Sequence, residues 1–251
     1  MRRLLLVILI LTSTAQVSAQ GFLAPSDTLN KKRVLGVSLT GGIAWAGSIS
    51  ALHFVWYKDV EKSKFHFFDD SREWQQMDKV GHMYTYWQFG RFVGDLYEWS
   101  GVDHKKSSII GAAYSFGYMT TFELLDATNE KWCFSWSDVG FNTLGTATYF
   151  VQEYLWNEQY ARFKFSYGNS GLAQYRPNVL GSDFANKLLK DYNGQTYWMS
   201  FNPVHWFKPE SRIPKWIDLS FGYSINNQLI GDGGTFIYTD GAEQLSFTPY
   251  R

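Results

Sequence analysis

The stretch Asp78-Lys79-Val80-Gly81-His82, with Asp138-Val139-Gly140-Phe141-Asn142 further along, predicts how the helices of this chain face one another. In each stretch two polar side chains lie four residues apart, so on a helix the pair would share one face. Glu123 lies in a third apolar segment between them, and Gly145 follows on the stripe of Asn142. Burying such groups costs free energy unless they pair, bind a metal or do chemistry. We therefore expect the polar faces to converge.

The pattern of apolar residues predicts four helices around these stretches. Glu123 falls in the last turns of the third helix, where the helix dipole disfavours a carboxylate, so we expect it to have a partner, with a helix end that faces water as the alternative. Asp70-Ser71-Arg72-Glu73 is typical of an N-terminal cap for the second helix, and Ser135 or Ser137 could cap the fourth. The predicted helices cover residues 34–57, 74–99, 107–128 and 137–156.

The first of these helices is long enough to cross a membrane. Residues 34–57 contain no acidic or basic side chain, and their small residues would allow close packing. Ser, Thr, Gly and His53 dilute the hydrophobicity, so a helix buried in the bundle is the alternative. The expected fold is mainly α: a four-helix bundle over residues 34–160, membrane-associated or membrane-embedded.

Residues 161–251 have a different pattern and predict an aromatic-rich α+β segment that contains β-strands. Charged and aromatic residues alternate over residues 162–167, which is the period of a strand. The sequence ends at Arg251 in a strand-like pattern, which leaves open whether the natural C-terminus lies further on. Strands are predicted at 162–167, 196–201, 216–225 and 235–238, and a short helix at 182–192.

The N-terminus predicts export. A basic start, Met1-Arg2-Arg3, precedes the apolar run Leu4–Leu11 and a small-residue cleavage signal, Val17-Ser18-Ala19. We expect a signal peptide over residues 1–19 and a linker over residues 20–33, with a retained signal anchor as the alternative. No Cys follows the apolar run, so lipid attachment there is not expected. The predicted location is the periplasm or the outer membrane of a Gram-negative bacterium.

The charge and the aromatic content of the chain limit the classes of partner that it could bind. The formal net charge is zero and no Lys/Arg run is present, which argues against nucleic acid. Aromatic residues make up 19% of the chain, and Trp and Tyr favour membrane interfaces and sugar-binding surfaces. An aromatic-rich core explains the same number equally well. We expect membrane or envelope components as partners, and a protein partner is not identified.

The order of polar residues resembles known families. Asp-Lys-x-x-His, then Glu, then Asp-x-x-x-Asn-x-x-Gly looks like the signature of VanZ-like helical membrane proteins. It is closer still to the YfiM-like family of predicted periplasmic proteins, over roughly residues 30–225. Further marks are the run from Lys190 to Trp198, Pro214-Lys215-Trp216 and Gly222-Tyr223. The resemblance implies an envelope protein and brings no established activity with it.

Two functions fit these observations best. The first is a non-catalytic envelope protein with a buried polar network and no cofactor. The second is a metal-dependent or acid–base hydrolase of a lipid or glycan, because facing helices can hold a divalent metal. A single His among the candidate ligands argues against a zinc site. The sequence also contains no Gly-x-Ser-x-Gly, P-loop or His-Glu-x-x-His motif. Binding of a lipid or glycan is a third possibility. The candidate catalytic residues are Asp78, His82, Glu123, Asp138 and Asn142, and all but Asn142 are candidate metal ligands.

Overall fold

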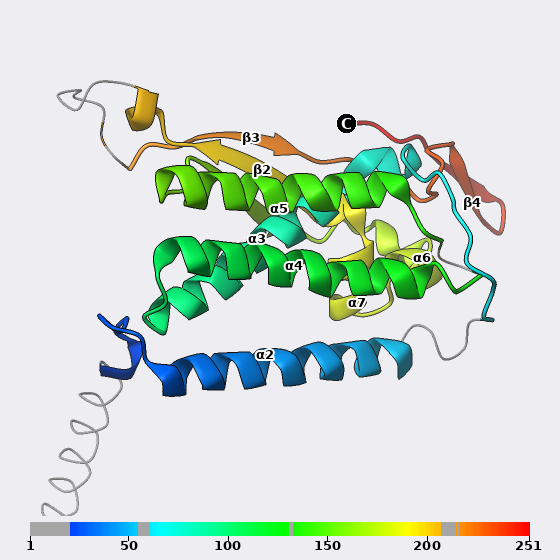
Figure 1. The fold of residues 1–251 in the computed structure, drawn as a ribbon. Coiled ribbons are helices and arrows are strands. Elements are labelled where there is room, and N and C mark those ends of the chain that lie inside the picture. The colour runs from blue at the N-terminus through cyan, green and yellow to red at the C-terminus, as the bar shows by residue number, and fades with distance from the viewer. Residues whose placement is uncertain (1–20, 55–60, 131–132, 207–213, 215) are drawn as a thin grey trace, which may run out of the picture.

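The computed structural model describes residues 21–54, 61–130, 133–206, 214 and 216–251. Long helices form the first half of the chain, and strands follow them, so the mainly helical prediction with a β-containing C-terminal segment is confirmed (Figure 1). The signal peptide expected over residues 1–19 lies outside the described residues. The long helices are α2 (Lys31–Leu52), α3 (Met77–Trp99), α4 (His104–Asp126) and α5 (Trp136–Trp156).

Three of these helices form a closely packed core. α3, α4 and α5 contact one another along their lengths, whereas α2 lies on their flank and none of its described side chains is buried (Figure 1). α2 is joined to α4 mainly through polar contacts: the Tyr114 hydroxyl donates to the Gly41 carbonyl oxygen at 2.6 Å, and the Tyr118 hydroxyl donates to Ser48 Oγ at 2.7 Å. The packing thus shows a three-helix core with a flanking helix.

Glycines allow the core helices to approach closely. A Cβ added at Gly145 of α5 would collide with the Met83 carbonyl oxygen of α3, and one at Gly111 of α4 would collide with that of Gly90. These neighbours are backbone atoms, which cannot move aside as a flexible side chain can. Gly145, which the sequence placed on the polar stripe, therefore serves the contact between α5 and α3.

The start of α3 differs from the prediction. The helix begins at Met77, because Trp74, Gln75 and Gln76 have positive φ angles of 48°, 48° and 64°. Its N-cap, Gln76, makes no side-chain capping bond, so the predicted cap at residues 70–73 is wrong. C-terminal residues hold this left-handed segment: the Trp74 amide donates to the Gly231 carbonyl at 2.7 Å, and Arg251 Nε donates to Gln75 Oε1 at 2.9 Å.

The other helix boundaries shift by a few residues. α2 ends at Leu52, and residues 55–57 of the first predicted helix lie outside the described residues. α4 begins at His104, where the Asp103 carboxylate accepts from the Lys106 amide. Ser135 caps α5 as predicted, since its Oγ accepts from the Asp138 amide at 3.1 Å.

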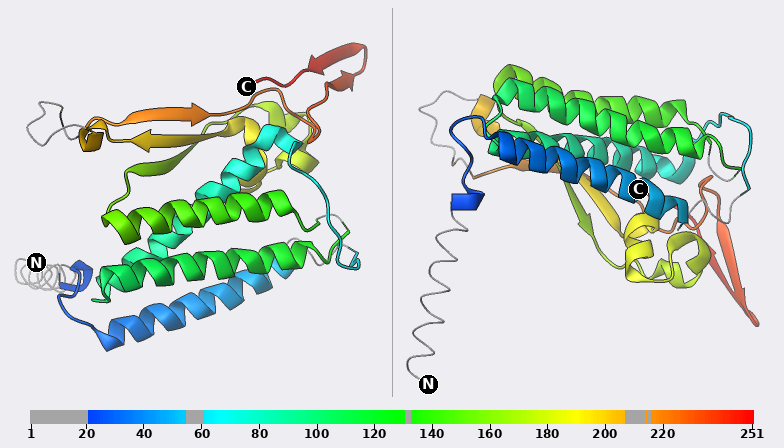
Figure 2. Two further views of the ribbon diagram at one scale, coloured as in Figure 1. Left: turned by 45° about the horizontal axis from the view of Figure 1, so that its top comes forward. Right: turned by 60° about the horizontal axis from the view of Figure 1, so that its bottom comes forward.

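A three-stranded antiparallel sheet packs on α3. Its order is β1-β2-β3, and α3 lies between this sheet and the pair α4–α5 (Figure 2). Trp87 of α3 packs edge-to-face on Phe163 of β1, with ring centroids 5.5 Å apart. β1 and β2 confirm the first two predicted strands. The strands of the sheet are β1 (Ala161–Tyr167), β2 (Gln195–Phe201) and β3 (Leu219–Tyr223).

The rest of the C-terminal segment is a hairpin and two short helices. β3 begins at Leu219 and not at residue 216, because its partner β2 ends opposite it at Phe201. β4 confirms the strand predicted at 235–238 with its ends shifted by one or two residues, and its partner β5 was not predicted. The bounds are α6 (Pro177–Leu180), α7 (Phe184–Lys190), β4 (Phe236–Asp240) and β5 (Glu243–Phe247).

Large apolar side chains are exposed on the outer sides of α2, α4 and α5, and we call these sides the outer apolar face. By length and composition, residues 31–51 of α2 could cross a membrane. Isolated exposed apolar residues are common on soluble proteins, but a continuous patch marks an interaction surface. The members include Leu35, Leu39 and Ile43 of α2, Ile109, Phe116 and Leu124 of α4, and Trp136, Leu144, Leu155 and Trp156 of α5.

Candidate functional site

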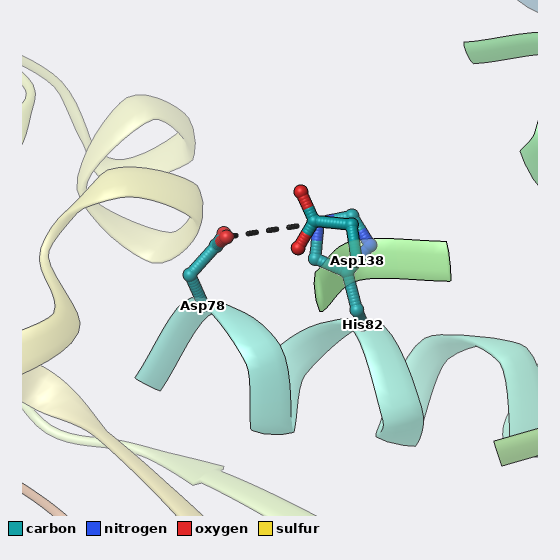
Figure 3. A group of neighbouring side chains, drawn as sticks. All are labelled: Asp78, His82 and Asp138. Atoms are coloured by element: carbon teal, nitrogen blue, oxygen red, sulfur yellow. Dashed lines mark ion pairs between the residues drawn. The ribbon is translucent and has the colours of Figure 1, made fainter. Parts of the chain in front are cut away.

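The five candidate residues come together at one end of the three-helix core. Asp78 and His82 lie at the start of α3, and Asp138 lies in the first turn of α5, directly opposite them (Figure 3). Glu123 approaches from the last turns of α4. Together with Asn142 and Lys79 these residues form what we call the polar cluster. Asp138, Asn142 and Glu123 are buried, whereas the side chains of Asp78 and His82 are 28% and 24% exposed.

His82 connects the two sides of the cluster. Its Nδ1 lies 2.9 Å from Asn142 Oδ1, and Asn142 Nδ2 donates to Glu123 Oε1 at 3.0 Å. Because an amide oxygen only accepts, the His82 Nδ1 carries the proton in this bond. His82 Nε2 lies 3.8 Å from both Asp78 Oδ2 and Asp138 Oδ1. Glu123 has the partner that its place in the helix led us to expect.

Lys79 provides the central positive charge. Its ammonium is 2.5 Å from Asp138 Oδ1, 2.5 Å from Asp70 Oδ2 and 3.0 Å from Asp78 Oδ2, and the side chain is 1% exposed. Our sequence analysis did not include Lys79 among the candidates, although it lies inside the quoted stretch. The available signal was its place next to Asp78 in an apolar helix, since a fully buried Lys is rare unless it is paired.

Asp70 joins the preceding loop to the cluster. Ser135 Oγ donates to Asp70 Oδ1 at 2.5 Å, and Ser137 Oγ donates to the same oxygen at 2.8 Å. The sequence suggested a helix cap at this position, but the carboxylate instead ties the loop to the start of α5. No local pattern distinguishes these two roles of an Asp.

The C-terminal segment covers the cluster with two tyrosines. The Tyr192 hydroxyl donates to Asp78 Oδ1 at 2.7 Å. The Tyr197 hydroxyl donates to Gln195 Oε1 and lies against Gly81, where an added Cβ would come within 2.8 Å of it. In the sequence, the run from Lys190 to Trp198, which contains both tyrosines, served only as a mark of the family resemblance and was not assigned to the site.

The positive groups of the cluster are held in their charged forms. Burial lowers the pKa of Lys79, but Asp78 and Asp138 outweigh it, and the pKa lies above its usual value. Burial also lowers the pKa of His82, but the charges of Asp78 and Asp138 outweigh it and raise this pKa above its usual value. Two positive groups thus face the carboxylates of the site.

The carboxylates divide into two kinds. Burial raises the pKa of Asp78, but His82 and Lys79 outweigh it and hold this pKa below its usual value. Burial dominates for Asp138, whose pKa is raised despite His82. Burial also raises the pKa of Glu123, from 4.5 to about 7, although His82 opposes the shift. The two buried carboxyl groups, those of Glu123 and Asp138, therefore hold a proton more readily than exposed ones do.

We predict a pH-dependent effect of Glu123→Gln. Folded protein binds the Glu123 proton more tightly than unfolded protein, so ionisation between about pH 4.5 and 7 destabilises the wild type as pH rises. The amide that replaces this carboxyl group cannot ionise, so the variant should gain stability relative to wild type by roughly 1–3 kcal/mol between pH 5 and 8. Urea unfolding at several pH values measures this difference, and a difference independent of pH would contradict it.

The spacing of three side chains would suit a metal ion. Asp78, His82 and Asp138 each offer a ligand atom, and these atoms lie within 4.8 Å of one another, whereas Glu123 is not in this group. The charges fit poorly, because the Lys79 ammonium already contacts both Asp78 and Asp138. A divalent cation between these carboxylates would be repelled by the ammonium or would have to displace it.

Two cavities lie away from the polar cluster. One of about 640 Å³ lies between α2, α3 and α4, and another of about 350 Å³ is lined by residues around Tyr167 and Phe184. Within the described part of the chain, neither of these two cavities is lined by a residue of the polar cluster.

Comparison with known proteins finds one family model that matches about a third of the chain, and the apolar N-terminal segment fits a signal sequence. Residues 66–154 match the model of the family described as "Predicted periplasmic lipoprotein (DUF2279)", whose function is unknown. The match contains Asp78, His82, Glu123 and Asp138. It supports an uncharacterised envelope family and does not bear on the YfiM-like name or the VanZ-like pattern. No curated protein and no solved structure matches the chain.

Proposed function

We propose that this chain is a non-catalytic protein of the cell envelope, in which the polar cluster stabilises the fold and the outer apolar face associates with a membrane. The observation that carries the proposal is that the charged side chains of the cluster pair with one another. A single buried ammonium, that of Lys79, contacts Asp70, Asp78 and Asp138. Buried charges that are paired and hydrogen-bonded in this way are typical of a structural network.

The contacts of the cluster also run between elements. They join α4 to α5 through Glu123 and Asn142, α3 to α5 through Lys79, and α3 to the C-terminal segment through Tyr192. Each hydrogen bond thus holds together different elements of the chain. A catalytic site would need room for a substrate beside its acid and base, and the two described cavities are elsewhere.

The membrane association rests on the outer apolar face. Trp136 at the start of α5 is 69% exposed and Trp156 at its end is 49% exposed, with exposed Leu144 and Leu155 between them. Exposed Trp side chains are typical of proteins that contact the interfaces of a bilayer. The periplasmic family description fits attachment at the inner face of the outer membrane or at the inner membrane.

A second candidate function is a metal-dependent or acid–base hydrolase that acts on a lipid or glycan. The observation that favours it is the group of ligand atoms on Asp78, His82 and Asp138. Asp78 and His82 are also the most exposed members of the polar cluster, so a substrate could reach them.

Elemental analysis separates the two functions. Full-length protein purified without a metal-binding tag should contain far less than one metal per chain, and added Zn²⁺, Mn²⁺ or Mg²⁺ should leave its melting temperature unchanged. A metal site would instead raise the melting temperature. When the free metal concentration is about 100 times the Kd, binding adds about 2.7 kcal/mol to the stability of the folded state. Loss of that metal in His82→Ala, but not in His104→Ala outside the cluster, would establish a metal site in the cluster and favour the hydrolase function.

A further inference from the structure

An apolar groove separates α2 from the three-helix core, and we call it the α2 groove. It has a volume of about 640 Å³, which lies within the range of roughly 300–1,000 Å³ typical of ligand pockets. Most of its lining residues belong to α2, α3 and α4, and Figure 1 shows α2 running alongside α4. Its apolar lining includes Val37 and Ala44 of α2, Phe89, Phe92 and Leu96 of α3, and Tyr114 of α4.

The side chains of α2 leave this groove open. Gly36 and Gly41 both line it, and a Cβ added at Gly36 would meet no atom within 4 Å. α2 is held beside the groove by a few polar bridges, such as the 2.8 Å contact between Ser38 Oγ and the Tyr97 hydroxyl. Trp45 adds an edge-to-face contact with Tyr114, with ring centroids 5.1 Å apart. The bridges fix the width of the groove without filling it.

One end of the α2 groove is positively charged. Lys32 and Arg33 line it where α2 begins and α3 ends. The Arg33 guanidinium donates to the carbonyl oxygens of Ala24 and Trp99 and lies 4.3 Å from the centroid of the Trp99 ring. The ion pairs among the described residues use other cations, so no described carboxylate lies within 4 Å of Lys32 or Arg33.

We propose that the α2 groove binds one acyl chain of an anionic phospholipid, whose phosphate lies at Lys32 and Arg33. The inference rests on the membrane association proposed above. An apolar channel with an uncompensated basic end is complementary to a molecule with a hydrocarbon chain and an anionic head. A neutral apolar ligand would leave the basic end unpaired, and a small anion would leave the apolar length empty.

Phosphorus analysis of the purified protein after incubation with a phospholipid tests whether the α2 groove binds that lipid. Purified full-length protein in mild detergent is incubated with phosphatidylglycerol or phosphatidylcholine and then freed of unbound lipid by gel filtration. Wild type should retain about one phosphatidylglycerol per chain and at least about fivefold less phosphatidylcholine. Gly36→Phe places a ring in the groove and should reduce retention at least about fivefold. Gly42→Phe is the matched control, because Gly42 lies on the same helix, has open space beside it and does not line the groove.

A charge-reversal pair tests the basic end. Lys32→Glu should weaken phosphatidylglycerol binding more than Lys31→Glu does, since Lys32 lines the groove and Lys31 does not. Equal retention in Gly36→Phe and Gly42→Phe would overturn the proposal. So would a bound fatty acid without phosphorus, or a dimer that Gly36→Phe dissociates, because the groove would then hold another occupant.

Cell fractionation keeps this proposal separate from the proposed function. If wild type sediments with membranes and resists a salt wash but retains no phosphatidylglycerol, the groove proposal fails and the membrane association stands. If wild type is found in the soluble periplasmic fraction, the proposed membrane association itself fails.

Discussion

Lys79→Met is expected to lower the melting temperature by roughly 10 °C, because it removes a buried ammonium that contacts three carboxylates. Met has nearly the length of Lys, so the change deletes the charge with little change of volume. Asp138 would remain buried without its closest positive partner, and breaking a buried pair in this way costs about 3–5 kcal/mol. Thermal unfolding followed by circular dichroism measures the effect.

Two further variants show that the loss arises from the buried pair. Lys164 is exposed and lies 3.2 Å from Asp218, so Lys164→Met should cost at most about 1 kcal/mol. The double variant Lys79→Met/Asp138→Asn removes the stranded charge as well and should recover part of the stability. A Lys79→Met protein that melts with wild type would show that the cluster carries little of the stability of the fold.

Gly145→Ala is expected to destabilise the protein by about 1–3 kcal/mol or more, because the new methyl group would collide with the Met83 carbonyl oxygen. Relief would require α5 to move away from α3, which would also stretch the hydrogen bond between His82 and Asn142. Urea unfolding gives the loss of stability directly.

The matched control is Gly140→Ala in the same helix. A Cβ at Gly140 meets no atom within 4 Å, so the substitution should be neutral or should stabilise α5 by about 0.5–1 kcal/mol through helix propensity. If both Ala variants unfold alike, the close approach of α5 to α3 is not what makes Gly145 necessary.

The sequence predicted the parts of the fold that depend on local periodicity. The buried residues of α5 are Asp138, Asn142, Gly145, Tyr149 and Gln152, which is the stripe expected from helical spacing. Strand β1 was predicted from the alternation over residues 162–167, which is also a local signal.

Contacts between distant segments could not be predicted in this way. α3 begins late because the Trp74 amide bonds to the Gly231 carbonyl, and nothing near Trp74 in sequence indicates that partner. Asp70 has the residue type and position of a helix cap, and only its distance to Lys79 shows its other role. Tyr192 reaches Asp78 across more than a hundred residues, so its place in the polar cluster depended on the tertiary structure.

The left-handed segment before α3 has a consequence for the order of assembly. Non-glycine residues in this conformation each cost about 1–2 kcal/mol, so Trp74 to Gln76 need outside support. Tyr223 and Arg251 supply it, through hydrogen bonds to Gln75 at 2.5 Å and 2.9 Å. The three-helix core can therefore collapse early, but the first turn of α3, with Asp78 and Lys79, is fixed only when the last thirty or so residues have docked. Formation of the polar cluster thus depends on the docking of the segment that contains Tyr223 and Arg251.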